Sequence, residues 1–461
     1  MINYFNFKKI NNNQFILTND FGNYVFLSPK EFYEFMTNKI DQSSELYTTL
    51  EDRHFIVPRN KKEILQNTQE EYRLSKNYLF NATSLHIFVV TNECNLRCVY
   101  CQARNETTHK NGFMTNEIAE KAVDIALSAP DKNLNFEFQG GEPLLNFPVI
   151  KHIVQYAEMK KGYHTIHYSV VTNLTLMTEE IIDFLGKYNI NISTSIDGGE
   201  FVHNCNRPFI NGKGSFEAVS KKLKAIRPQI SSIGAIQTTT RNSLSRYKEI
   251  IDAYISLGFD NIFIRPLTPL GTASKAWDTI GYSPEEFLDF YKNSLDYIIE
   301  LNKKGILFRE GHASMFLSKI VHKQPLNYME LRSPCGASIG QIAYYFNGDV
   351  FTCDEGRMLS EMGDDSFKLG NVNSSTYDSL MSSNTCKTVC LSSLLESLPG
   401  CTDCVYQPFC GTCPVVNYAT EKNIFRRDVY NYRCKIYGGM LDIIFRMLSS
   451  DDEAKSILSC W

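Results

Sequence analysis

The chain has 461 residues, of which 43% are hydrophobic and 21% are charged, so it can form two or three globular cores. Its formal net charge of -4 argues against a nucleic-acid partner, which would need a basic surface. We find no signal peptide and no apolar run near the roughly 18 residues of a membrane span, so we expect a soluble cytoplasmic protein without membrane contact.

Residues 1–60 predict a small module of strands followed by helices. Three short strand-like runs, separated by turn-prone residues, come first: NYFNFKKI, NQFILTN and YVFLS. Ser28, with Pro29 and Glu31 behind it, predicts a capped helix to about Thr37, and a second helix should begin near Ser44. Residues 61–83 are charged and polar, and predict a helical linker.

The next part of the chain, residues 84–275, alternates apolar strands with amphipathic helices. We expect the strands at residues 85–90, 134–140, 166–173, 190–198, 232–240 and 261–268. This alternation predicts an α/β fold with a parallel sheet wound as a barrel. Six units rather than eight predict a partial (β/α)6 TIM-like barrel with an open side. Two further helices predict a bridge over residues 276–334.

The last part of the chain is rich in turns and carries ten of the 14 cysteines, from Cys335 onward. A reducing cytosol disfavours structural disulfides, so clustered cysteines indicate metal sites. We expect a cysteine-rich domain at residues 335–440, and a closing helix and tail at residues 441–461.

A first cysteine cluster, Cys94, Cys98 and Cys101, directly follows the first barrel strand. This places it at the C-terminal mouth of the sheet, where such folds keep their active sites. Thiolates suit zinc or iron–sulfur clusters, and a closed structural zinc site needs four ligands. Three cysteines instead suit a 4Fe–4S cluster with one open iron. A zinc knuckle completed by a distant residue is the alternative.

The segment CNLRCVYC, with the aromatic Tyr100 before its third cysteine, resembles the CX3CX2C signature of the radical S-adenosylmethionine (SAM) superfamily. The resemblance implies that SAM binds the open iron. It also implies that the reduced cluster cleaves SAM to a 5′-deoxyadenosyl radical, which abstracts a hydrogen atom from substrate. A reducing partner such as flavodoxin or ferredoxin would supply the electron.

The mouth of the barrel carries further residues that the resemblance assigns to SAM. The turn Gly140-Gly141-Glu142, followed by proline, resembles the family's GGEP turn, in which glycines allow close approach to the SAM amino group. A plain tight turn is the alternative. Other strand-end residues would contact the SAM carboxylate, ribose and adenine, unless they are ordinary solvated or capping residues: Thr172, Asn173, Ser195, Asp197, Arg207 and Leu267.

The second cysteine cluster resembles the SPASM domain of radical SAM peptide and protein maturases. Gly348–Cys353 gives GX4C, and Cys401–Cys410 gives CX2CX5C. Two spacings depart from the pattern: seventeen residues separate Cys335 from Cys353, and Cys410–Cys413 is CX2C where CX3C is typical. A zinc ribbon is the alternative.

The SPASM resemblance implies two auxiliary 4Fe–4S clusters, hence three clusters in all. The ligands of the outer one would be Cys401, Cys404, Cys410 and Cys434. Those of the inner one would be Cys335, Cys353 and Cys413. Related sulfatase-maturating enzymes have one more cysteine where this chain has Met329. The inner cluster is therefore open, or it is completed by another residue such as Glu330, Cys386 or Cys390.

A carboxylate follows the inner cluster's second cysteine. In the sulfatase-maturating enzymes an aspartate at the place of Asp354 is the proposed base, and a carboxylate near a buried cluster suits that role. Glu355 is a second candidate. A turn or capping aspartate is the alternative.

The N-terminal module resembles PqqD-like domains, which bind a leader peptide by adding it as a strand to a sheet edge. A stabilising extension is the alternative. Phrases such as FILTNDFGNYVFLSPKEF and CVYQPFCGTCPVVNY most resemble the His-Xaa-Ser system B-type maturases.

These resemblances imply an enzyme that modifies a ribosomally made precursor peptide by hydrogen abstraction. It would form a thioether or carbon–carbon crosslink, with an auxiliary cluster taking the surplus electron. One alternative is oxidation of a protein Cys or Ser to formylglycine, as in sulfatase maturation. The other is a non-catalytic iron–sulfur electron-transfer or scaffold protein.

Overall fold

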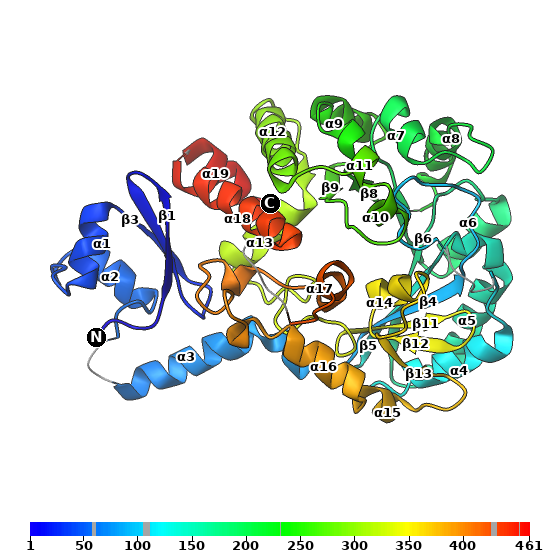
Figure 1. Ribbon diagram of the computed structural model, residues 1–461, viewed down its shortest axis with the longest axis horizontal. Helices are drawn as coiled ribbons and strands as arrows, with labels where there is room; N and C mark the ends of the chain where they lie inside the picture. The colour runs from blue at the N-terminus through cyan, green and yellow to red at the C-terminus, as the bar shows by residue number, and fades with distance from the viewer. Residues whose placement is uncertain (58–60, 105–110, 231, 426–430, 451) are drawn as a thin grey trace.

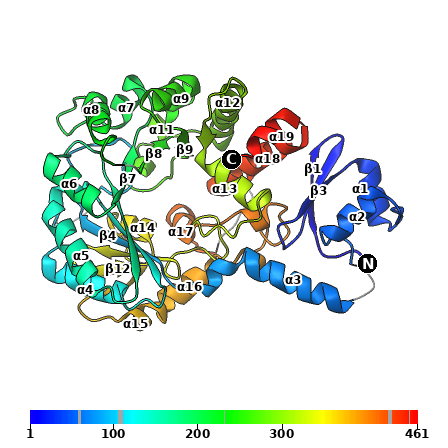
Figure 2. The same cartoon turned by 180° about the vertical axis from the view of Figure 1, so that it is seen from behind.

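The computed structural model describes residues 1–57, 61–104, 111–230, 232–425, 431–450 and 452–461 (Figure 1). The N-terminal module lies at one end of the molecule and the barrel at the other. The C-terminal helices and the cysteine-rich loops lie between them (Figures 1 and 2).

The module contains an antiparallel sheet of strands β1 (Asn6–Asn11), β2 (Gln14–Thr18) and β3 (Tyr24–Leu27), in that order. Helices α1 (Pro29–Met36) and α2 (Glu45–Asp52) follow, and Ser28 and Glu31 form the expected capping box. Apolar side chains of the sheet and both helices share one core. Helix α3 (Lys61–Ser75) and the short η1 (Asn77–Phe80) lead into the barrel.

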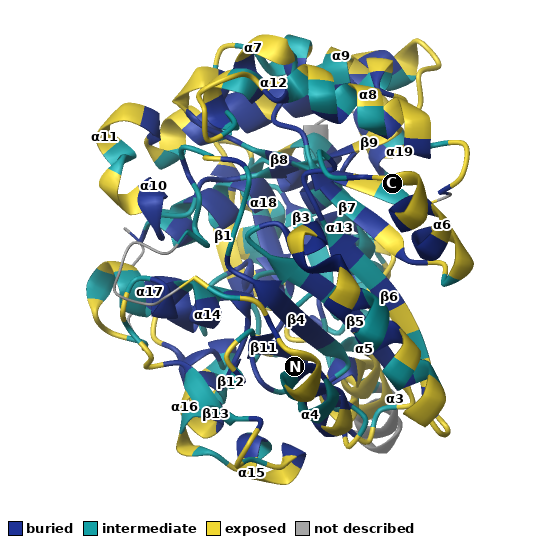
Figure 3. Ribbon diagram, turned by 90° about the vertical axis from the view of Figure 1, so that its right-hand side faces the viewer, coloured by how far each residue is buried: buried dark blue, intermediate teal, exposed yellow. Residues whose placement is uncertain are grey.

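The barrel contains all six expected strands, each parallel to its neighbours: β4 (Leu85–Thr91), β5 (Asn133–Gly140), β6 (Thr165–Val171), β7 (Asn191–Ser195), β8 (Ile233–Thr238) and β9 (Asn261–Arg265). Helices that cover its outer face are α4 (Asn116–Ala126), α5 (Phe147–Lys160), α6 (Glu179–Lys187), α7 (Glu200–Asn206), α8 (Phe216–Ile226) and α9 (Tyr247–Ser256). Figure 3 shows buried strands inside and exposed helix faces outside, as amphipathic helices on a parallel sheet require. The α/β class and the barrel are confirmed.

The sheet extends beyond six strands, which the sequence did not predict. Its order is β10-β9-β8-β7-β6-β5-β4-β11-β12-β13. The added strands are β10 (Arg309–Glu310), β11 (Gln341–Tyr345), β12 (Asp349–Phe351) and β13 (Lys368–Asn371). The expectation of a turn-rich region after the bridge was therefore incomplete, because β11 pairs in parallel with β4 and places the cysteine-rich region beside the barrel mouth.

The remaining helices pack around this extended sheet. Those of the bridge are α10 (Thr272–Lys275), α11 (Trp277–Ile280), α12 (Pro284–Lys303) and α13 (Gly311–Ile320). Those of the C-terminal part are α14 (Asp354–Ser360), α15 (Tyr377–Met381), α16 (Asn384–Ser392), α17 (Pro414–Glu421), α18 (Tyr432–Ser450) and α19 (Asp452–Leu458). Among the described helices, none is long and apolar enough to span a membrane.

Candidate active site

A cavity of about 470 Å³ opens where the barrel strands end. The thiols of the first cluster line it, together with Gly140 and Gly141 of the turn after β5. Of the other residues expected at this mouth, Tyr100, Glu142, Thr172, Asn173, Ser195 and Arg207 also line this cavity.

Backbone hydrogen bonds hold the cysteine loop from both sides. The N–H groups of Arg97 and Val99 donate to Pro208 O at 2.8 Å and to Asn206 O at 2.9 Å. On the other side, Thr272 donates to Cys101 O through its N–H at 2.9 Å and its Oγ1 at 2.6 Å. The chain thus fixes where the three thiols lie.

The turn after β5 packs directly on the residues that precede the cysteines. Gly141 N donates to Thr91 O at 3.0 Å, and Glu142 N donates to Glu93 O at 2.8 Å. A Cβ atom on Gly141 would lie 2.2 Å from Glu93 O. Glycine is therefore required here by a close approach of two backbone segments.

Glu142 connects this turn to the end of β6. Its carboxylate accepts hydrogen bonds from Thr172 Oγ1 at 2.6 Å, Asn173 N at 2.8 Å and Leu144 N at 3.1 Å. Burial raises the pKa of Glu142 to about 7, against the lowering effect of these hydrogen bonds. Glu142, Thr172 and Asn173 all line the cavity.

A buried charged group supports the other wall. The Asp197 carboxylate accepts hydrogen bonds from Tyr100 Oη at 2.7 Å, Arg207 Nε at 3.3 Å and Thr238 N at 3.2 Å. Tyr100 and Arg207 line the cavity with Ser195, whereas the fully buried Asp197 lies behind them. Asp197 thus positions the lining residues, and Arg207 places Nη1 3.8 Å from Cys98 Sγ.

Leu267 lies apart from the residues above. Its N–H donates to Tyr282 Oη at 2.6 Å, and it lines a separate small cavity with Val416 and Tyr432. Arg265 and Pro266, just before it, line the large cavity instead.

Several lining residues were not singled out from the sequence. They are Asn92, Glu93, Arg97, Gln102, Gln139, Thr238, Arg265 and Met358. Gln139, Thr238 and Arg265 are polar residues at strand ends, so the signal that selected Thr172 would have found them. Met358 comes from α14 in the C-terminal part, and no sequence signal joins it to the barrel.

The inner thiols of the C-terminal part also lie together. Burial first, and then neighbouring charges that include Cys413 and Cys335, raise the pKa of Cys353 well above its usual value. Cys353 caps α14, and its Sγ accepts a hydrogen bond from Gly356 N at 3.3 Å. All three thiols are buried.

The outer cysteines form a second group. Burial first, then the nearby thiols of Cys410, Cys434 and Cys401, raise the pKa of Cys404 to about 11. Cys335, Cys353 and Cys413 belong to one packed cluster, whereas Cys401 and Cys410 pack together in another.

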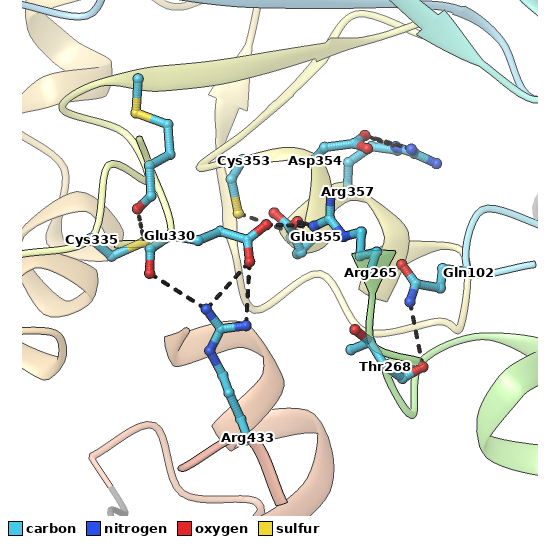
Figure 4. Close-up of polar contacts among 12 residues, drawn as sticks. Gln102, Arg265, Thr268, Glu330, Cys335, Cys353, Asp354, Glu355, Arg357 and Arg433 are labelled. Atoms are coloured by element: carbon cyan, nitrogen blue, oxygen red, sulfur yellow. Dashed lines mark hydrogen bonds and ion pairs between the residues drawn. The ribbon is translucent and has the colours of Figure 1, made fainter. Parts of the chain in front are cut away.

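The three candidates for a fourth ligand of the inner cluster, Glu330, Cys386 and Cys390, have different partners. The Glu330 carboxylate contacts Arg265 and accepts a hydrogen bond from Arg433 at 3.3 Å (Figure 4). It also accepts a hydrogen bond from Tyr437 Oη at 3.2 Å. On α16, a hydrogen bond with the Cys390 thiol lowers the pKa of Cys386 to about 7.

The two candidate bases point in different directions. Asp354 Oδ1 accepts hydrogen bonds from Arg357 Nε at 3.1 Å and Nη2 at 2.5 Å. Glu355 turns toward Cys353 and Arg265, with its carboxylate 3.8 Å from Arg265 Nη2 (Figure 4).

These donor sets fit iron–sulfur clusters. The inner thiols are buried and the thiols of the other two sets are partly or fully buried, and thiols become thiolates when a bound metal supplies positive charge. The first set adds the Arg207 guanidinium near Cys98 Sγ, which offsets thiolate charge. Within the described parts of the chain, no three His, Cys, Asp or Glu side chains gather closely enough to hold a single metal ion.

Comparison with known proteins identifies a family. Residues 88–239 match the radical SAM superfamily. An uncharacterised protein of Methanocaldococcus jannaschii is 30% identical over 50% of this chain and 83% of its own length. A cysteine-type anaerobic sulfatase-maturating enzyme of Clostridium perfringens is 25% identical over 79% of this chain and 97% of its own length.

A solved structure shares the fold. The crystal structure of Streptococcus suis SuiB bound to precursor peptide SuiA superposes with a TM-score of 0.56 at 16% identity. It covers 93% of this chain and 99% of that chain.

Proposed function

The chain belongs to the radical SAM superfamily, and from this premise we propose that it is a maturase that crosslinks a ribosomally made precursor peptide. The observation that carries the proposal is the 470 Å³ cavity, which brings three thiols, the Gly140-Gly141 turn and Arg207 to one barrel mouth. Two further groups of cysteines lie in the C-terminal part, and the N-terminal module hydrogen-bonds to the loop of the outer group.

Different residues of the cavity would bind the cluster and SAM. Cys94, Cys98 and Cys101 would hold the SAM-binding 4Fe–4S cluster, and SAM would lie against the glycine turn, Ser195 and Arg207. When reduced, the cluster with bound SAM supplies a 5′-deoxyadenosyl radical that removes a hydrogen atom from substrate. The rest of the chain's task is to position the substrate hydrogen and exclude water.

Two further groups of thiols would hold auxiliary 4Fe–4S clusters. The inner ligands would be Cys335, Cys353 and Cys413, and the outer ligands would be Cys401, Cys404, Cys410 and Cys434. Their role would be to pass one electron away from the product, and a flavodoxin or ferredoxin would supply the electron that starts each turnover.

Forming the crosslink removes two hydrogen nuclei and two electrons from the peptide. One hydrogen atom leaves a peptide carbon and ends in 5′-deoxyadenosine. A second peptide group, such as a cysteine thiol, loses a proton and bonds to that carbon, and one electron then leaves. Asp354, held by Arg357, is the carboxylate we assign to accept the proton. The peptide product is lighter by two hydrogen atoms.

The N-terminal module is an argument for a peptide substrate. In the described sheet neither β1 nor β3 pairs with a fourth strand, so a leader peptide can extend it. SuiB, whose structure holds a precursor peptide, shares the fold over nearly the whole chain. The local phrases quoted above favour the His-Xaa-Ser system among such maturases.

Oxidation of a protein cysteine or serine to formylglycine is the second candidate. It is favoured by the similarity to the sulfatase-maturating enzyme of Clostridium perfringens, nearly all of whose length this chain matches. A sulfatase peptide substrate would distinguish the two proposals.

Anaerobic reconstitution with iron, sulfide, SAM and a chemical reductant tests the proposal. With a candidate precursor peptide present, we expect 5′-deoxyadenosine and a peptide mass lower by two hydrogen atoms. The variant with Cys94, Cys98 and Cys101 all changed to Ala should form neither. Deoxyadenosine at the level of this variant would contradict the enzyme proposal, and formylglycine in a sulfatase peptide would favour the second candidate.

A further inference from the structure

The inner thiol group has three cysteines for a cluster that binds four ligands. This inference rests on the proposed function, which places a 4Fe–4S cluster at Cys335, Cys353 and Cys413. Met329 stands where a fourth cysteine would be, and its carbonyl lies 3.5 Å from Cys335 Sγ. A thioether is a weak partner, so the fourth corner needs another donor.

Glu355 is an acidic side chain whose charge acts on all three thiols. After burial, its charge raises the pKa of Cys353 well above the usual value, and it also raises the pKa of Cys335 and Cys413. It acts on all three because it lies in the first turn of α14, two residues after Cys353, and turns back toward the Cys353 sulfur (Figure 4).

The Glu355 carboxylate is not committed to protein partners as its neighbours are. Its ion pair with Arg265 is long, at 3.8 Å, and its side chain keeps 21% exposure. Asp354, one residue earlier, is held by two hydrogen bonds from Arg357. A carboxylate that is held loosely beside three thiols can turn to a metal without breaking a close hydrogen bond.

Glu330 is the rival carboxylate, and its oxygens are engaged. One contacts Arg265, and the other accepts hydrogen bonds from Arg433 and Tyr437. Moving Glu330 onto iron would leave the buried Arg433 and the partly buried Arg265 without their carboxylate partner, which is costly for a buried charge. Figure 4 shows this carboxylate held between the two arginines.

The cysteines of α16 are the other rivals. Cys386 and Cys390 hydrogen-bond to each other, one turn apart on the same helix. Ser393, at the end of α16, accepts a hydrogen bond from Cys335 N at 3.0 Å, so α16 meets the inner group at Cys335. The α16 pair thus lies to one side of the group.

We propose that the Glu355 carboxylate is the fourth ligand of the inner cluster, so that this cluster has three thiolates and one oxygen donor. Carboxylates bind iron, and an oxygen donor is a harder, weaker partner than a thiolate at a cluster corner. The inner cluster is then closed to a substrate thiolate in the resting protein, and its role is electron transfer.

The test uses the full chain with Cys94, Cys98 and Cys101 changed to Ala, which leaves the two auxiliary clusters. After anaerobic reconstitution this parent should hold about eight iron atoms per chain. In that background we would compare Glu355→Gln, Glu355→Cys and the control Glu330→Gln by iron analysis and EPR spectroscopy, before and after mild oxidation.

We expect the parent, Glu355→Cys and Glu330→Gln to keep their iron on mild oxidation. Glu355→Gln should lose about one iron per chain and show the EPR signal of an oxidised 3Fe–4S cluster, because one corner lacks a ligand. An exogenous thiol should change the reduced spectrum of Glu355→Gln only.

Other outcomes would overturn the inference. Glu355→Gln with the parent's iron content and spectrum would show that Glu355 is no ligand. A parent that itself loses one iron would show an open corner. A parent with only about four iron atoms would remove the inner cluster itself, and with it this part of the proposed function.

Discussion

At the scale of single residues, Asp197 organises a wall of the cavity without lining it. One carboxylate accepts hydrogen bonds from a tyrosine, an arginine and the backbone of β8. From sequence, Asp197 was expected to contact SAM itself. Its place behind Tyr100 and Arg207 depends on side-chain packing, which no spacing of polar residues encodes.

We expect Asp197→Asn to lower the free energy of unfolding by about 1–3 kcal/mol, because the amide leaves donors of Tyr100 and Arg207 poorly paired in a buried site. Urea unfolding of the cluster-free protein measures this loss. SAM turnover should also fall, since Arg207 loses the charge that orients it. The exposed Asp289→Asn should stay within about 0.5 kcal/mol of the parent. Equal unfolding of both variants would contradict the positioning role.

At the scale of elements, β11 joins the cysteine-rich part to the barrel. It lies between β4 and β12, with Ala343 opposite Ile87 on one side and Phe351 on the other. Only Thr352 separates the end of β12 from Cys353, so this strand pair fixes where the Cys353 thiol lies relative to the barrel.

The strands of the barrel could be predicted because long apolar runs alternate with amphipathic helices. The strand QIAYY is short and buried at all five positions, so it shows no alternation, and its parallel partner β4 lies about 250 residues earlier. Such a distant pairing leaves no local signal. The spacing of Cys94, Cys98 and Cys101, by contrast, could be read directly, because all three lie in one short loop after β4.

We expect Ala343→Pro to destabilise the chain by about 3 kcal/mol or more, because proline removes a donor within a central strand. The reconstituted variant should also lose inner-cluster iron, because Cys353 is displaced. Ala343→Gly keeps the N–H and should cost only about 1 kcal/mol. Thermal unfolding and iron analysis would measure both changes; full iron retention in the proline variant would contradict the role given to β11.

At the scale of the whole molecule, the N-terminal module rests on the outer cysteine loop. Asn6 Nδ2 donates to Thr402 O at 3.0 Å and to Cys404 O at 3.3 Å, and Thr18 Oγ1 donates to Val405 O at 2.7 Å. The module was interpreted from sequence as a peptide-binding domain. Its contacts give it a second role, as a support for the segment that would hold the outer cluster.

Thr18→Val tests this support, since valine keeps the shape and removes only the donor to Val405 O. We expect a loss of about 1–3 kcal/mol in unfolding free energy, because a buried carbonyl is left unpaired. Outer-cluster iron should also dissociate faster when a chelator is added to the reconstituted protein. Thr37→Val is the matched control, because Thr37 Oγ1 donates to Tyr33 O at 2.7 Å at the exposed C-terminal end of α1. If both variants released iron at the parent's rate, the module would support the outer loop through other contacts than this hydrogen bond.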